Sequence, residues 1–452
     1  LGVLTVNTDF AETEVDAAQV NLTRFPLLYP EKRAFFLEGS NLFQYSLGLS
    51  ETFIPFYSRR VGLVAGVPVP IDAGAKIVGR QGPWSFAVLD TRTAAIDELP
   101  ATNLFAGRAT YDVTPELRIG ALATDGDPAG DADNRFAGVD AVWQTSSFRG
   151  NRNFSVSSWA AKSFGDLAAG ENSGYGGRIA YPNDLWDVFA EYDVFGEALD
   201  PALGFLARPG TRQLSGGGAY QPRPSSPLLT SWVKQFTFEL YYSQVDGLDG
   251  EKQSSQLFTA PFNIETPAGG HYEANWVPNF ERLDEPFEIS DGVIIPVGDY
   301  NFTRYRIETE SPVLGAWQFG QATRFGSFYD GDLVRFSPYL NWSSETGRWQ
   351  AQFSGERVNG RLPQGNFIER LWQLQLAWAR TPDFVVNSFV QYDSSANAFG
   401  ANTRLRWTFR PGCDLFVVWN SNFRDPSAGD PLNDVGLPRN ALVVKLRWTF
   451  GR

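Results

Sequence analysis

The dominant feature of this sequence is an alternation of apolar and polar residues with a period of two. The pattern is clearest at 303–310, 348–356, 370–378 and 403–410. In the last of these, Leu405, Trp407 and Phe409 alternate with polar side chains. Successive side chains of a strand point to opposite faces, so these segments are predicted to be strands with one apolar and one polar face.

The lengths of the predicted strands and of their connections narrow the fold class. Each strand runs for about nine to thirteen residues, close to the length that crosses a bilayer at a tilt. Tight turns are expected at 80–84, 113–117, 181–186, 343–349, 380–384 and 410–414, and longer polar loops at 125–134, 195–210, 281–298 and 422–440. Short turns on one side and long loops on the other are typical of an outer-membrane barrel.

The tryptophans support the same assignment. Ten of the 14 lie near a predicted strand end on the side of the short turns: Trp84, Trp143, Trp186, Trp232, Trp317, Trp342, Trp349, Trp378, Trp407 and Trp448. Such clustering is typical of an aromatic girdle at a membrane interface. Core tryptophans of a soluble β protein are the alternative, but they need not gather at one end of the strands.

The predicted fold class is all-β, a transmembrane antiparallel β-barrel of the bacterial outer membrane. Counting back from a last strand at 440–450 gives about 22 strands, within a range of 18–22, if 2–9 is the first. Both termini are then periplasmic. We expect 1–72 to hold the first strand plus a plug-like or long-loop segment, and 73–452 to form the barrel. The aromatic end of the last strand resembles the signal read by the outer-membrane insertion machinery.

Composition excludes several functions. The net charge of −13 argues against nucleic acid as a partner, because phosphates call for a basic surface. A single cysteine, Cys413, permits no intrachain disulfide. The only histidine, His271, lies beside a tight turn, and hydrolase, nucleotide and zinc-protease motifs are absent from the sequence. We therefore predict no enzyme activity, no catalytic residues and no cofactor. The chain also lacks methionine, so we expect it to start inside a longer precursor.

One acidic loop, 125–134, is a weak candidate for a Ca²⁺ site. Its carboxylates are Asp125, Asp127, Asp131 and Asp133. Oxygen ligands at this density suit Ca²⁺, but the spacing is not that of an EF-hand. A solvated acidic loop is the better interpretation.

Four stretches carry a resemblance to a known family: 5–43, FYSRRVGL at 56–63, 68–80, and DPALGFLAR at 200–208. Together they resemble a bacterial envelope family in which a domain similar to carbohydrate-binding module family 9 precedes a domain of unknown function (domain of unknown function 5916). This chain resembles the second part. The resemblance implies an outer-membrane barrel and supplies no activity or substrate.

The run RFPLLYPEKRAFFLEGSNLF at 24–43 is too charged for a membrane helix and too rich in proline for a long soluble one. It lies within 10–72, one long connection between the first predicted strand and the clear hairpins. A 22-stranded barrel has a wide lumen that is usually plugged. We expect a plug or constriction, with a further hairpin plus an ordered external loop as the alternative. The charged candidates within it are Glu31, Lys32, Arg33, Glu38, Arg59 and Arg60.

The polar faces of the C-terminal strands carry many charges that are expected to line the lumen. They are Arg304, Arg306, Glu308, Glu310, Arg324, Arg335, Arg404, Arg406, Lys445 and Arg447. A basic lumen wall would favour anionic solutes, whereas charge ladders can equally hold the barrel in shape. The leading prediction is a channel or transporter for a small saccharide or anionic solute. The alternative is a structural anchor for a periplasmic domain or a larger envelope complex. The expected partners are the lipid bilayer and lipopolysaccharide.

Overall fold

The computed structural model describes residues 1–8, 16–49, 52–64, 66–130, 132–424 and 440–448. The chain divides into two compact units. Unit 1 comprises residues 1–10, 25–220 and 240–256, and unit 2 comprises residues 11–24, 221–239 and 257–452. The predicted all-β antiparallel fold is confirmed, because strands dominate both units and each strand pairing whose register is described is antiparallel. Among the described residues, no helix is long and apolar enough to cross a membrane.

Unit 1 is built on long antiparallel strands that pair in chain order. They are β1 (Gly2–Thr8), β5 (Ile71–Gln81), β6 (Trp84–Thr93), β7 (Asn103–Asp112), β8 (Leu117–Asp125), β9 (Asn134–Phe148), β10 (Arg152–Gly165), β11 (Ser173–Pro182), β12 (Trp186–Phe195), β14 (Thr211–Tyr220) and most of β16 (Phe238–Gly247). The first strand expected from the sequence, 2–9, is present as β1 and pairs with β5, Leu4 standing opposite Ala75.

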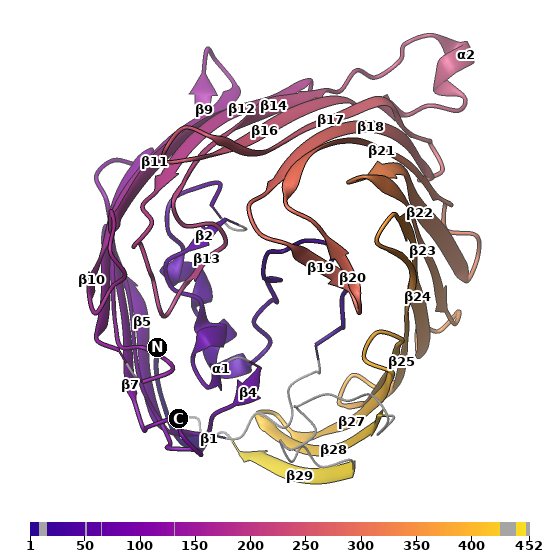
Figure 1. Ribbon diagram of the computed structural model, residues 1–452. Helices are drawn as coiled ribbons and strands as arrows, with labels where there is room; N and C mark the ends of the chain where they lie inside the picture. Colours follow the sequence, from indigo (N-terminus) through magenta and orange to yellow (C-terminus); the bar gives the residue numbers. More distant parts are fainter. Residues whose placement is uncertain (9–15, 50–51, 65, 131, 425–439, 449–452) are drawn as a thin grey trace. The chain divides into compact units, whose positions relative to one another are not determined.

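Short elements of unit 1 lie on one face of these strands (Figure 1). They are α1 (Ala34–Leu37), η1 (Ser40–Phe43), β2 (Phe53–Ile54), η2 (Ser58–Arg60), β3 (Leu63–Val64), β4 (Val67–Pro68) and β13 (Phe205–Leu206). β2 pairs with β13, so the N-terminal segment is joined to the loop between β12 and β14. We call residues 25–64 the inner segment and the strand face that it contacts the covered face.

Unit 2 contains a second series of antiparallel strands. They are β15 (Gln235–Phe236), most of β17 (Lys252–Glu265), β18 (His271–Leu283), β21 (Gly298–Glu310), β22 (Trp317–Phe328), β23 (Gly331–Ser343), β24 (Trp349–Leu362), β25 (Gly365–Thr381), β26 (Phe384–Asp393), β27 (Ala398–Arg410), β28 (Cys413–Arg424) and β29 (Asn440–Trp448). α2 (Pro227–Thr230) is a single turn outside them. The last residues of the strand predicted at 440–450, Phe450 among them, lie outside the described residues.

The loop expected at 281–298 contains more structure than its sequence suggests. It forms a hairpin of β19 (Phe287–Ser290) and β20 (Val293–Ile295), which lies beside β21–β25 in Figure 1. Val293 and Ile295 are buried against strand residues such as Leu333 and Val358. Apolar residues at alternate positions drive this packing, because they leave water together.

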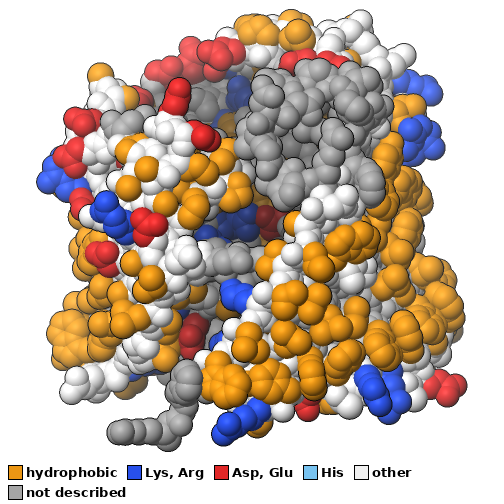
Figure 2. Space-filling view, turned by 90° about the horizontal axis from the view of Figure 1, so that it is seen from below, with side chains coloured by type: hydrophobic (Ala, Val, Ile, Leu, Met, Phe, Trp, Pro, Cys, Tyr) orange, Lys and Arg blue, Asp and Glu red, His pale blue; other side chains and the backbone are white. Residues whose placement is uncertain are grey.

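The period-two pattern gives the strands of each unit an apolar face. In unit 1 that face exposes Phe86, Val88 and Ile179, and in unit 2 it exposes Ile307 and Leu446. Figure 2 shows that hydrophobic side chains cover large areas of the surface. Exposed apolar area of this extent marks a surface that contacts something other than water.

Aromatic side chains meet across neighbouring strands beside the short turns. Trp84 and Tyr111 have ring centroids 4.8 Å apart, and those of Trp349 and Trp378 are 5.6 Å apart. Each of these pairs is also opposite in the strand register. Several of the tryptophans that the sequence placed at strand ends thus pack in cross-strand pairs, as interfacial aromatics do in outer-membrane barrels, whereas Trp232 lies in the turn that follows α2.

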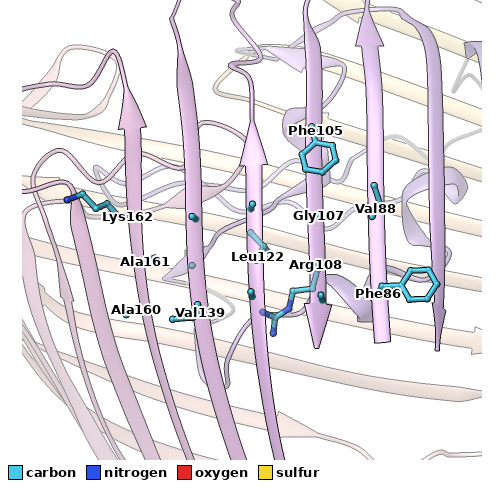
Figure 3. A pocket seen from close by; sticks show the side chains of 15 residues that line it. Phe86, Val88, Phe105, Gly107, Arg108, Leu122, Val139, Ala160, Ala161 and Lys162 are labelled. Atoms are coloured by element: carbon cyan, nitrogen blue, oxygen red, sulfur yellow. The ribbon is translucent and has the colours of Figure 1, made fainter. Parts of the chain in front are cut away.

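The apolar face of unit 1 carries a shallow groove over β6–β10, with a volume of about 700 Å³. In Figure 3, Phe86, Val88 and Phe105 lie on one side of the groove, and Val139 and Lys162 lie on the other. Gly107 and alanines of β7–β10 form the floor, so the groove is a consequence of small side chains between larger ones.

A charged strand face as candidate functional site

The polar face of β21–β29 in unit 2 holds most of the predicted charges, and we call it the charged face. Arg306, Arg324 and Arg335 stand directly opposite one another on the adjacent strands β21, β22 and β23. Directly opposite residues share a face and lie about 5 Å apart. We call these three residues the arginine ladder. Like charges in such positions repel, so an arrangement of this kind needs compensating groups.

Carboxylates compensate the two ends of the arginine ladder. Arg306 forms an ion pair with Glu308, and its Nη1 lies 3.5 Å from Oε1 of Glu273. At the other end, Nη2 of Arg335 lies 2.5 Å from Oε2 of Glu356.

The middle arginine differs from its neighbours. Arg324 has no hydrogen bond or ion pair to any residue that the structure describes. Its direct neighbours across the strands are the other two arginines of the ladder. The middle of the arginine ladder is therefore one place on this face where a positive charge has no bonded partner among the described residues.

Arg304 belongs to the same predicted set of lumen charges, but its guanidinium is already bonded to the backbone. Its Nη1 donates to the carbonyl oxygens of Gly326 and Leu333, both at 2.7 Å, and its guanidinium lies over the ring of Phe328. Glu310 is also engaged, since its Oε1 accepts a hydrogen bond of 2.6 Å from Gln318. These two residues stabilise the strands and offer little to a ligand.

A second group of predicted charges lies on β27–β29. Arg404, Arg406 and Arg447 line a small cavity of about 210 Å³ together with Asp414 and Asn387. Asp414 is directly opposite Arg447, and Lys445 is opposite Phe416. One carboxylate among three guanidiniums leaves this cavity with an excess of positive charge.

The predicted plug residues bind mainly to one another. Glu31 and Arg33 form an ion pair at 2.7 Å, and Arg33 also donates to the carbonyl oxygens of Val61 and Ser58. Arg59 donates to the carbonyl oxygen of Pro30. These contacts fold the inner segment back on itself.

Two further plug candidates connect the inner segment to the rest of unit 1 through backbone groups. Arg60 donates to the carbonyl oxygen of Ala202 at 3.1 Å. The carbonyl oxygen of Glu38 accepts a hydrogen bond of 2.6 Å from Lys76. The backbone N–H of Lys32 donates to Oε1 of Glu31 at 2.9 Å.

The strongest attachment of the inner segment uses residues that the sequence analysis did not single out. Arg108 binds Asp140 with both terminal nitrogens, at 2.5 and 2.9 Å, and its Nε donates to the carbonyl oxygen of Gln44. The guanidinium also lies over the ring of Tyr45. Asp140 in turn accepts a hydrogen bond from the backbone N–H of Ser46. The only sequence signal was a charge at alternate positions that are otherwise apolar or small.

Tyr45 completes this attachment. Its hydroxyl donates to the carbonyl oxygens of Val139 and Ala160, at 2.8 and 2.9 Å. Burial, and then the charge of Asp140, raise the pKa of Tyr45 well above its usual value, so the hydroxyl stays protonated and remains a donor. Around it, Phe53, Phe136, Trp159 and other buried side chains form an apolar cluster.

The remaining predicted residues are the aspartates of the acidic loop at 125–134 and His271. Asp133 pairs with Arg135 at 2.8 Å, whereas Asp131 lies outside the described residues. No group of three metal-ligating side chains occurs in the part of the chain that the structure describes. His271 begins β18, where its Nε2 lies 3.0 Å from Oδ1 of Asn263.

Comparison with known proteins gives a family match over a limited region. Residues 4–72 match the model of a family described as Domain of unknown function (DUF5916). This region contains most of β1 and the whole inner segment. No curated protein matches the chain.

Several solved structures of outer-membrane receptors are similar to this chain. The ferric-catecholate import receptor Fiu from E. coli K12 is 5% identical, with a TM-score of 0.46 over 78% of this chain and 68% of the receptor. The ferric preacinetobactin receptor BauA from Acinetobacter baumannii is 7% identical, with a TM-score of 0.43 over 78% of this chain and 67% of the receptor. The ferric enterobactin receptor from Pseudomonas aeruginosa is 10% identical, with a TM-score of 0.39 and coverages of 78% and 65%.

Proposed function

We propose that this chain is an outer-membrane barrel through which a small anionic solute crosses the membrane. The arginine ladder on the charged face of unit 2 carries the proposal, because Arg324 presents a guanidinium that is bonded to none of the residues the structure describes. Rings of arginine select anions in pores. A saccharide, the other solute considered from the sequence, needs no such charge.

The two strand faces support the membrane setting. The apolar face exposes aliphatic and aromatic side chains on long antiparallel strands, which suits contact with lipid acyl chains and lipopolysaccharide. In a closed barrel the charged and covered faces would line the lumen, and both termini would be periplasmic. The last strand, β29, would then be the element that the insertion machinery reads.

The inner segment is proposed to act as a plug or constriction. Its attachment through Tyr45, Arg108 and Asp140 is buried, and such contacts hold a segment in one place. A solute would then pass only when the inner segment leaves room or moves. Residues 1–72 and the strands from residue 73 onward would thus have separate roles in one integrated barrel.

A structural anchor is the second candidate, and the same attachment favours it. If the inner segment stays fixed on the covered face, the barrel holds its position without conducting. It would then anchor a periplasmic part, such as the carbohydrate-binding-module-like domain that the family resemblance implies, or belong to a larger envelope complex.

Planar bilayer recordings distinguish the two candidates. The full chain and a variant lacking residues 26–60 would be reconstituted, and the reversal potential measured in a KCl gradient. Conductance with anion preference in either protein supports passage of anions. Silence of both proteins refutes passage and leaves the anchor. Swelling of liposomes in neutral sugars and in organic anions of equal size then separates a saccharide from an anionic solute.

A further inference from the structure

We propose that Arg306, Arg324 and Arg335 form a binding site for one oxyanion group of a small solute, either a carboxylate or a phosphate. The inference deepens the proposed function, on which it rests for its biological role. Binding itself requires no transport, so it is tested separately.

Register is the first argument. Arg306 is directly opposite Arg324, which is directly opposite Arg335, so three guanidiniums lie side by side across β21, β22 and β23. Neighbouring strands are about 4.8 Å apart, so an oxyanion between two of the guanidiniums reaches both. Guanidinium groups bind carboxylates and phosphates through parallel N–H donors.

Unused donors are the second argument. Arg306 and Arg335 each have a buried Nε without a hydrogen-bond partner among the described residues. Arg324 lies between them and has no hydrogen bond or ion pair with any described residue. Buried polar groups in folded proteins are normally satisfied. Glu308 Oε2 and Glu356 Oε1 are buried without a hydrogen-bond partner among the described residues as well, and both carboxylates lie at the ends of the ladder. An anion at Arg324 would supply acceptors in the middle of the ladder, where no described carboxylate is bonded.

Competition by the chain's own carboxylates defines the position of the anion. Arg306 is engaged by Glu308 and Glu273, and Arg335 by Glu356. The two ends of the arginine ladder are therefore partly neutralised, and the excess positive charge is at Arg324. Removing a carboxylate at one end should strengthen anion binding.

The surroundings strengthen the site on one side. Leu333 and Val358, two buried residues of the cluster that contains Val293 and Ile295 of the β19–β20 hairpin, flank Arg335. Leu333 is two residues away on the same strand, and Val358 is directly opposite. An apolar neighbour excludes water, and charge-assisted hydrogen bonds are stronger where water is excluded.

The test is calorimetric titration of the purified full-length chain in detergent micelles with sodium phosphate, and separately with sodium acetate, at constant ionic strength. Saturable binding of at least one anion is expected. R324Q should weaken it by about tenfold or more, since an ionic hydrogen bond is lost. R348Q, which removes the same charge from an exposed turn of unit 2, should bind as the unaltered chain does. The stronger of the two anions identifies the solute group.

A second variant keeps the proposal testable if R324Q does not fold. E356Q removes the carboxylate that competes at Arg335, and we expect it to raise the affinity several-fold. Unchanged or weaker binding in E356Q, equal binding in R324Q, or no saturable binding by the unaltered chain would overturn the site. Binding without conductance would refute passage but not the site. Anion-selective conductance with unaltered binding in R324Q would refute the site but not passage.

Discussion

The carboxylate of Asp140 on β9 accepts hydrogen bonds from both terminal nitrogens of Arg108 on β7. It also accepts a hydrogen bond from the backbone N–H of Ser46 in the inner segment. The two side chains are only 4% and 2% exposed. Asp140 therefore neutralises a buried cation and attaches the inner segment to the strands at the same time.

Replacing Asp140 by Asn should loosen this attachment. The change leaves a buried guanidinium without its counter-charge, which typically costs about 3–5 kcal/mol. We expect a lower midpoint of urea unfolding and faster proteolysis within residues 25–64. The matched control is D133N, because the ion pair of Asp133 with Arg135 is more than half exposed and such pairs contribute about 1 kcal/mol or less. Equal effects of the two variants would contradict the structural role of Asp140.

Substitution of Gly204 by alanine tests the contact between the inner segment and the β12–β14 loop. A Cβ at this position would lie 2.4 Å from the backbone carbonyl oxygen of Ile54, which cannot move without breaking the β2–β13 pair. We expect G204A to separate the inner segment from the loop and to destabilise unit 1 by a few kcal/mol, as overpacking does (about 1–3 kcal/mol). The measurement is the unfolding midpoint together with protection of residues 52–57 from hydrogen exchange. G298A, where an added Cβ finds only ordinary contacts, should have little effect.

In the sequence, the stretch 200–208 was notable only because it resembles the family with the domain of unknown function. In the structure this stretch contacts the inner segment. The backbone N–H of Tyr57 donates to the carbonyl oxygen of Leu203, and the rings of Tyr57 and Phe205 are in contact. Segments separated by about 150 residues thus form one contact. Such pairing is not visible in local periodicity.

The strands themselves could be predicted because their periodicity is local. The alternating segments at 303–310 and 403–410 lie within β21 and β27, and each ends at the last residue of its strand, Glu310 and Arg410. The arginines of the charged face were also identified, since alternation fixes the face of a strand residue. The alignment of these arginines across neighbouring strands could not be predicted, because the register of a strand pair depends on its turns and bulges. The partners of Arg108 could not be predicted either, because they lie far away in the sequence.

Protonation of Glu31 should release the inner segment at low pH. Burial alone would raise the pKa of this carboxyl, but the hydrogen bonds and charge of Arg33, with the Ser58 hydroxyl, outweigh burial and hold the pKa below its ordinary value of 4.5. A depressed carboxyl pKa stabilises the fold above the unfolded-state value. This stabilisation is lost as the pH falls below 4.5 through the folded-state pKa.

The measurement is the rate of proteolysis within residues 25–64 by an acid-active protease between pH 6 and pH 3. We expect the unaltered chain to lose protection toward the acid end. E31Q should be less protected than the unaltered chain at pH 6 and should change less with pH. A parallel pH dependence in the two proteins would show that other groups control the inner segment.

The β19–β20 hairpin offers a test with two adjacent residues of the same type. Ile295 is fully buried in the apolar cluster of unit 2, whereas Ile294 is 49% exposed on the other side of the strand. I295A should destabilise unit 2 by about 2–5 kcal/mol, because it removes buried methyl groups and leaves a cavity. I294A should change the stability by less than about 0.5 kcal/mol, as surface substitutions usually do.

The same pair of variants connects the hairpin to the arginine ladder. The cluster that holds Ile295 includes Leu333, two residues from Arg335 on the same strand, so loosening the hairpin admits water beside the guanidiniums. Water weakens charge-assisted hydrogen bonds. At a urea concentration where both variants remain folded, I295A should therefore bind phosphate or acetate more weakly than I294A. Equal affinities would mean that the arginine ladder functions independently of the hairpin that packs beside it.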